Sequence, residues 1–79
     1  MKSRVYFFHF EERSQAEIAK RKITDHGHTA MVCVLDPRVV QLSDKTYRNI
    51  IKEMGVLSDN FSGMTKVESE LAEKVGSAP

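Results

Sequence analysis

The sequence predicts a small α+β domain: a ferredoxin-like βαββα sheet packed by two helices, with a further helix at the C-terminal end. Three observations support this fold class: a β-branched and aromatic run at residues 4–10, helical periodicity that begins after polar capping residues, and a Val-rich hairpin between the helices. Parallel strands joined through a helix cross over right-handedly, and a hairpin after the second strand then gives a split β-α-β sheet. The alternative is a three-stranded sheet that is completed only in a dimer.

The first strand is expected at residues 4–10, and a helix over 15–25 follows it. Ser14 and Glu17 have the spacing of a capping box at the start of this helix, and Gly27 supplies its end. The apolar face of the helix is narrow and rich in alanine, so the helix can lie close to a sheet. The residues on this face are Ala16, Ala19 and Ile23.

A hairpin is expected next. Residues 29–35 are rich in Val and Met and form the second strand, and residues 38–42 form the third. Asp36 and Pro37 between them are a turn signal, so the third strand should return antiparallel to the second.

The clearest helix begins after Ser43, which is a good N-cap, and Gly55 ends it. Leu42 before the cap can pack on Tyr47 as a hydrophobic staple. The apolar positions then follow helical spacing without a gap, at Tyr47, Ile50, Ile51 and Met54.

The C-terminal third is predicted to be a loop and then a helix. Residues 56–63 are loop-like in composition, and either residues 56–57 or Phe61 could add a short edge strand. Thr65 and Glu68 form a second capping box. The helix that it starts would carry on one side Val67, Leu71 and Val75, and would end at Gly76. One domain is therefore expected over residues 1–75, with a flexible tail at 76–79.

Size and charge limit the classes of function. A chain of 79 residues with 41% apolar residues has room for one core and little room for an enclosed pocket. Twelve Lys and Arg against eleven Asp and Glu leave a formal charge of +1, far from the basic balance typical of nucleic-acid binding proteins.

The location of the protein is predicted from its N-terminal segment, the length of its apolar runs and its single cysteine. Residues 1–8 fail as a signal peptide because His9 and the acidic residues after it interrupt the apolar run. No run approaches the roughly 20 apolar residues that span a bilayer. The single cysteine, Cys33, lies between valines, where a buried reduced thiol is expected. We therefore expect a cytoplasmic protein with no membrane contact.

The first strand carries large apolar side chains on both faces. Alternation separates two rows: Val5, Phe7 and His9 on one face, and Arg4, Tyr6, Phe8 and Phe10 on the other. A sheet with helices on one side only would leave one row exposed. The surplus row is therefore either covered by the C-terminal helix, or a contact for another protein, or a stacking platform for unpaired bases.

Residues 5–10 resemble the first-strand motif of RNA-recognition domains, in which the aromatic residue at the position of Tyr6 stacks on a base. The resemblance implies binding to single-stranded nucleic acid. Those domains carry a second signature with glycines and aromatics on the third strand, and residues 38–42 contain neither.

Two polar clusters are candidate sites. Lys20, Arg21 and Lys22, with Arg13 before them, could meet phosphates, or they could form a solvated face. Asp25, His26 and His28 crowd at a helix-terminal turn, and the sequence offers no further ligands at a zinc-like spacing. Solvated imidazoles are the expected state, and a buried structural role is expected for Cys33.

The leading hypothesis is a non-catalytic protein-binding module, a small regulator or inhibitor that docks on another protein or self-associates as a homodimer. Its contact residues would be Tyr6, Phe8, Phe10, Ile18 and Met31. The alternative is a single-stranded RNA- or DNA-binding domain that uses Tyr6, Phe8, Arg13, Lys20, Arg21 and Lys22. The third candidate is a small hydrolase that uses His26 or His28 with Asp25. The leading hypothesis needs no catalytic residue, metal or cofactor.

Overall fold

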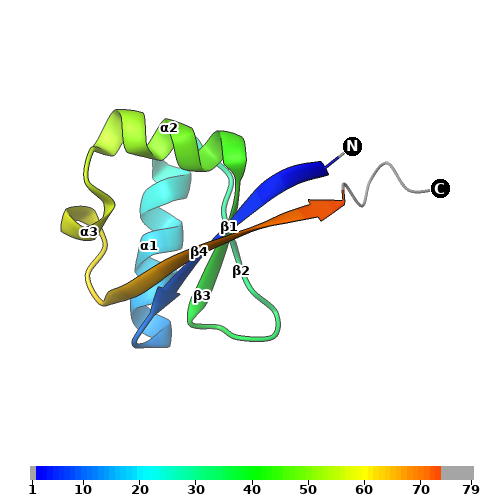
Figure 1. The fold of residues 1–79 in the computed structure, drawn as a ribbon. Helices are drawn as coiled ribbons and strands as arrows, with labels where there is room; N and C mark the ends of the chain where they lie inside the picture. The colour runs from blue at the N-terminus through cyan, green and yellow to red at the C-terminus, as the bar shows by residue number, and fades with distance from the viewer. Residues whose placement is uncertain (1, 74–79) are drawn as a thin grey trace.

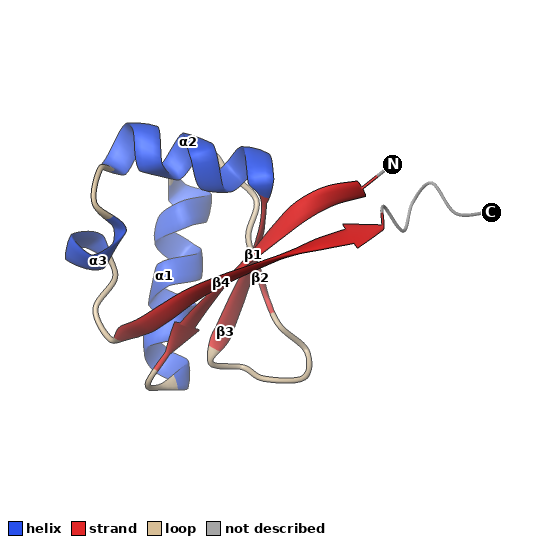
Figure 2. Ribbon diagram, in the orientation of Figure 1, coloured by secondary structure: helices blue, strands red, loops and turns tan. Residues whose placement is uncertain are grey.

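A computed structural model describes residues 2–73. Its elements, in chain order, are β1 (Lys2–Phe10), α1 (Arg13–Asp25), β2 (Met31–Val32), β3 (Val39–Ser43), α2 (Asp44–Met54), α3 (Leu57–Asn60) and β4 (Met64–Glu73) (Figure 1). The four strands form one antiparallel sheet, and the helices lie on one side of it (Figure 2). The predicted α+β class is therefore confirmed.

The strand order in the sheet is β2-β3-β1-β4. β3 lies between β1 and β2, the two strands that α1 connects, as in a split β-α-β unit. β1 is central and pairs with β3 on one side and with β4 on the other. The two edge strands of the sheet differ in length: β4 has 10 residues, whereas β2 has only 2.

The hydrophobic core lies between the sheet and the helices. It joins the inward row of β1 to β3, α1 and α2, and its buried members are Phe8, Phe10, Ala16, Ala19, Ile23, Ala30, Val40, Leu42, Ile50 and Phe61. Phe8 is completely buried, and its ring lies 5.8 Å from that of Phe61. Tyr6 stacks on Tyr47 of α2 with ring centroids 3.7 Å apart, which fixes α2 against the sheet.

α1 buries the three predicted residues but begins earlier than predicted. Its N-cap is Glu12, whose backbone is extended and whose N–H donates to Gln15 Oε1 over 3.0 Å. Ser14 is therefore inside the first turn, and the capping box predicted at Ser14 is wrong. β1 ends at Phe10, so only Glu11 and Glu12 lie between the strand and the helix. Glu12, the residue directly before the helix, keeps an extended backbone and is therefore the N-cap.

α2 matches its prediction at both ends. The Ser43 side chain accepts a hydrogen bond from the Thr46 N–H at 3.2 Å, which satisfies one of the free donors of the first turn. At the other end Gly55 has φ 79°, a conformation that costs glycine little, and its N–H donates to the Ile51 carbonyl.

The hairpin forms as predicted, but its first strand is short. Only Met31 and Val32 pair with β3, opposite Gln41 and Val40. Pro37 follows Asp36 in a turn that the hydrogen bond from the Val39 N–H to the Asp36 carbonyl closes at 3.0 Å. Beyond the hydrogen bond from the Cys33 N–H to the Val39 carbonyl, the chain before this turn leaves the sheet, so the strand predicted over 29–35 is mostly loop.

The helix predicted over residues 65–75 is wrong within the described residues. Residues 64–73 form β4, which pairs with β1 along nearly its whole length. Lys66, Glu68 and Glu70 alternate with Val67 and Leu71, and this period of two is the strand pattern that the capping-box motif obscured. A four-residue helix, α3, occupies the segment where a loop or short strand was expected. Val75, Gly76 and the predicted tail at 76–79 lie outside the described residues.

Candidate protein-binding surface

The structure places the five predicted contact residues in different parts of the fold. Phe8 and Phe10, with 0% and 4% of their surface exposed, are core residues and cannot form a docking surface in this fold. Tyr6 is half-buried under Tyr47. Ile18 and Met31 are 62% and 60% exposed, but Ile18 lies on α1 in the helical layer and Met31 on the sheet. The five residues therefore do not make one surface.

The face of the sheet away from the helices is the open sheet face. By alternation and register it carries Val5, Phe7 and His9 of β1, Met31 of β2, Val39 and Gln41 of β3, and Lys66, Glu68 and Glu70 of β4. Its members along β1, β3 and β2 are mostly apolar, and Phe7 is half-buried there. The helices do not cover this row, so the row of β1 that faces away from them is the half-buried one that begins with Val5, opposite to the predicted one.

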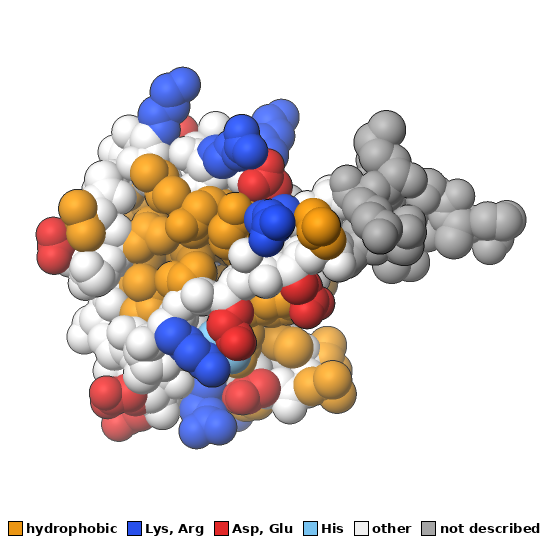
Figure 3. Space-filling model, in the orientation of Figure 1, with side chains coloured by type: hydrophobic (Ala, Val, Ile, Leu, Met, Phe, Trp, Pro, Cys, Tyr) orange, Lys and Arg blue, Asp and Glu red, His pale blue; other side chains and the backbone are white. Residues whose placement is uncertain are grey.

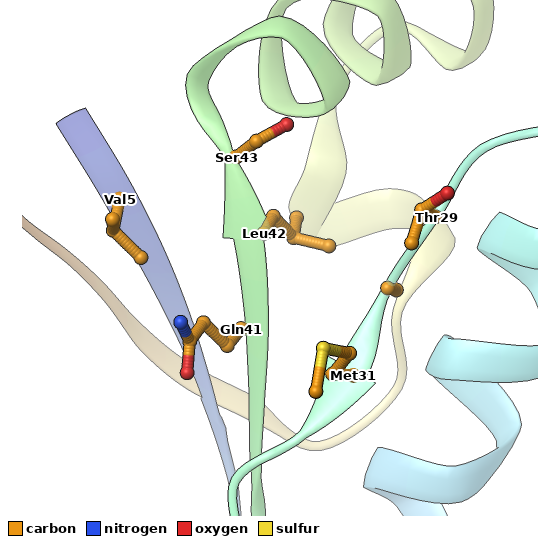
Figure 4. Close-up of a pocket in the computed structure, with 7 residues that line it drawn as sticks. Val5, Thr29, Met31, Gln41, Leu42 and Ser43 are labelled. Carbon is orange, nitrogen blue, oxygen red and sulfur yellow. The ribbon is translucent and has the colours of Figure 1, made fainter. Parts of the chain in front are cut away.

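A hollow of about 230 Å³ opens on this face where β3 and the chain before β2 diverge. Pairing between these strands stops at Met31, and Thr29 and Ala30 continue without a partner on β3. The side chains around the hollow come from β1, β3 and the segment leading into β2 (Figure 4). They are Val5, Thr29, Ala30, Met31, Gln41, Leu42 and Ser43.

The hairpin loop, residues 33–38, presents two bare apolar side chains. Val34 and Leu35 are each 93% exposed, and the loop projects away from the helices (Figure 1). The turn after them is held by two hydrogen bonds: Asp36 Oδ1 accepts the Arg38 N–H at 3.0 Å and the Arg38 Nε–H at 3.3 Å. The backbone N–H of Arg38 and then its guanidinium hold the pKa of Asp36 below its ordinary value of 3.8.

The β4 side of the open sheet face is charged. His9 Nε2, which is buried, lies 2.6 Å from Glu68 Oε1. Lys66 Nζ lies 3.6 Å from the other oxygen of Glu68. The face is thus divided into an apolar part near β2 and a charged part along β4.

Comparisons with known protein families, with curated proteins and with solved structures found no match to this chain. Within residues 2–73, none of the helices combines the length and the apolar character that a membrane crossing demands. The surface therefore has to be interpreted from its own residues.

The histidines near the end of α1 do not share a site. His26 Nδ1 contacts the Lys22 carbonyl at 2.9 Å, as a cap on its own helix, whereas His28 Nε2 contacts both carboxylate oxygens of Glu53 at 3.1 Å. Among the described residues there is no group of three or more His, Cys, Asp or Glu placed to hold a metal ion. Asp25 is exposed. His26 thus contacts its own helix, and His28 contacts α2.

The residues of the nucleic-acid alternative are also separated. Tyr6 and Phe8 point toward the helices, so they cannot stack on bases. Lys20 and Arg21 are exposed on α1, and Lys22 donates to the Asn60 carbonyl at 3.0 Å. The basic cluster and the aromatic row thus lie on different layers of the molecule.

Cys33 is half-buried rather than buried. It follows β2 instead of lying within it, and its N–H donates to the Val39 carbonyl at 2.8 Å. Sequence reasoning also missed Phe7, Val34 and Leu35 as surface residues. The signal that could have found the loop pair was the Asp36-Pro37 turn, because a strand has to end before such a turn.

Proposed function

We propose that this chain is a non-catalytic protein-binding module that docks on another protein through the apolar part of the open sheet face and the hairpin loop. The docking residues are Val5, Phe7, Met31, Val34 and Leu35. The observation that carries the proposal is the pair Val34 and Leu35, each 93% exposed in the loop that follows β2, the strand that carries Met31, which is 60% exposed. Contiguous exposed apolar side chains are characteristic of protein contacts.

The energetics favour a protein partner. Burying one Val or Leu side chain stabilises a complex by about 1.5–3 kcal/mol, so this surface can supply most of the binding free energy from a few residues. Hydrogen bonds from Arg38 and Val39 to Asp36 already close the turn after Leu35, and a preformed turn loses less entropy on docking. The partner would offer an apolar groove to the loop.

A nucleic-acid ligand is the weaker alternative on this surface. Phe7 is the one aromatic residue of the open sheet face among those described, and Glu68 and Glu70 stand on the neighbouring strand. These carboxylates would repel phosphates. Cytoplasmic location belongs to the proposal and is supported by the single free cysteine, Cys33.

Site-specific photo-crosslinking tests the proposal. A photoreactive amino acid is placed at position 35, and a control probe is placed at position 20, which is exposed on α1. In cells that naturally express the chain, the position-35 probe should give one protein adduct that the position-20 probe does not give. Adding Met31→Asp should remove the adduct, whereas adding Lys52→Ala on α2 should not.

Two results would count against docking through this surface. An adduct that survives Met31→Asp would place the contact elsewhere. Binding of a labelled oligonucleotide that weakens steeply with salt and is lost in Phe7→Ala would favour the nucleic-acid alternative. Circular dichroism of each variant checks that the fold persists, as the exposure of these side chains predicts.

A further inference from the structure

β4 is by far the longer of the two edge strands of the sheet. It runs for 10 residues, with one side paired to β1 and the other side without a partner in residues 2–73. Long edges of this kind are templates for a further strand, and proteins commonly shorten or cover them. Val67 and Leu71, on the row of β4 that faces the helical side, are 37% and 59% exposed.

An apolar groove adjoins this row on the helical side. It is a shallow hollow of about 420 Å³ lined by Tyr47, Ile51, Gly55, Val56 and Leu57. Tyr47 stacks on Tyr6, and Tyr6 pairs with Ser69, so the groove runs beside β4. Figure 3 shows the apolar side chains gathered between α2, α3 and β4, with charged side chains around them. The edge therefore offers both backbone groups and apolar surface.

We propose that two copies of this chain pair through their β4 edges, antiparallel and centred on Val67, to form one continuous eight-stranded sheet. This contact lies on the opposite edge of the sheet from the hairpin loop, and it is independent of the proposed docking function. Strand addition of this kind gains affinity from main-chain hydrogen bonds and specificity from the alternate side chains.

The charges of β4 select this register. Pairing about Val67 places Lys66 opposite Glu68 of the second copy, and by symmetry this pair occurs twice. The same register places Val67 opposite Val67 and Thr65 opposite Ser69. Opposite charges directly across a strand pair are stabilising, and like charges are destabilising.

Each neighbouring register places like charges opposite each other. Pairing centred on residue 66 opposes two lysines, and pairing centred on residue 70 opposes two glutamates. Pairing centred on residue 68 places Lys66 opposite Glu70 twice but also Glu68 opposite Glu68. Pairing centred on residue 69 places Glu68 opposite Glu70 twice. Of the five registers centred on residues 66–70, only the one centred on Val67 has opposite charges face to face and no like charges. The charged residues of β4 thus disfavour pairing in the other four registers but permit the register centred on Val67.

The pairing is also closed. A twofold contact uses both β4 edges, and the remaining edges of the joined sheet are the two β2 strands, each with 2 residues. An edge this short gives little template for further strands. The expected product is a dimer rather than a filament.

The solution mass tests the proposal with charge-reversal variants of the whole chain. At about 100 µM, light scattering should give twice the monomer mass of 9.0 kDa. Lys66→Glu and Glu68→Lys should each give the monomer mass alone, because each variant places two like-charged pairs across the dyad. An equimolar mixture of the two variants should return to the dimer mass, because every crossed pair is then of opposite charge.

The controls separate dimerisation from folding. Lys20→Glu changes the net charge as Lys66→Glu does but lies on α1, and it should stay dimeric. Since Glu68 also contacts His9, the double variant Lys66→Glu with Glu68→Lys serves as the second check, and it should be dimeric by itself. A wild-type chain that is monomeric at 100 µM, a dimeric Lys66→Glu variant, or a mixture that stays monomeric would each overturn the proposal. None of these results bears on crosslinking through position 35.

Discussion

Truncating neighbouring phenylalanines of β1 is the sharpest test of which face of the sheet is the core. Phe8 is 0% exposed and contacts the helical layer, whereas Phe7 lies on the open sheet face and is half-buried. Replacing a fully buried Phe by Ala costs about 3–5 kcal/mol, since it removes apolar contacts and leaves a cavity. We expect Phe8→Ala to lower the free energy of unfolding by about 4 kcal/mol, and Phe7→Ala to lower it by less than about 1.5 kcal/mol.

The size of the domain makes this difference easy to measure. A 79-residue chain has a free energy of unfolding of roughly 4–12 kcal/mol, so Phe8→Ala removes from a third to all of it. With an m-value of about 1–2 kcal/mol/M, the urea midpoint should fall by roughly 2–4 M. Circular dichroism at low micromolar concentration follows the transition.

The comparison has a clear opposing outcome. If Phe7→Ala lowers the urea midpoint as much as Phe8→Ala does, the Phe7 row is part of the core and the open sheet face is covered. The docking proposal would then lose its surface. A folded Phe7→Ala variant next to a mostly unfolded Phe8→Ala variant supports the assignment of faces.

Three further predictions concern single positions. Ser43→Ala removes the N-cap of α2 and should lower the free energy of unfolding by about 1 kcal/mol in urea titration, and an unchanged midpoint would contradict the capping role. Gly63→Ala should lower the free energy of unfolding by about 1–3 kcal/mol, because φ is +80° and the added methyl group meets the Gln15 side chain. Gly27→Ala, where φ is +85° and the space around the added methyl group is open, should lower it by about 1 kcal/mol through backbone strain alone. The folded-state pKa of Asp36 is lowered, so its stabilising effect is complete above the ordinary value of 3.8 and is lost as the pH falls through the lower folded pKa. Wild-type stability should therefore fall more steeply than that of Asp36→Asn between pH 5 and pH 2 in pH-dependent melts, and parallel curves would argue against the hydrogen bonds from Arg38.

The elements that sequence predicted correctly are those with a local cause. The α2 helix needs only a Ser43 cap, a gapless apolar stripe and a glycine stop, and all three are set within one segment. The Asp36-Pro37 turn is equally local. By contrast, residues 64–73 carry both a capping-box spacing and a two-residue alternation, and the pairing with β1 decides between them. A helix there would leave β1 as a bare edge.

The sequence by itself determined the fold class, the inward stripe of α1 and the presence of large apolar groups on both faces of β1. Only the tertiary structure decided which of those faces is covered. Alternation assigns Phe7 and Phe8 to opposite sides of the strand but does not say which side is buried. That is decided by the helices, which pack on the side where Ala16, Ala19, Ile23 and Ile50 meet the sheet. The tertiary structure also decided that Val34 and Leu35 lie in an exposed loop and that one edge of β4 is unpaired within residues 2–73, because both depend on where strand pairing stops.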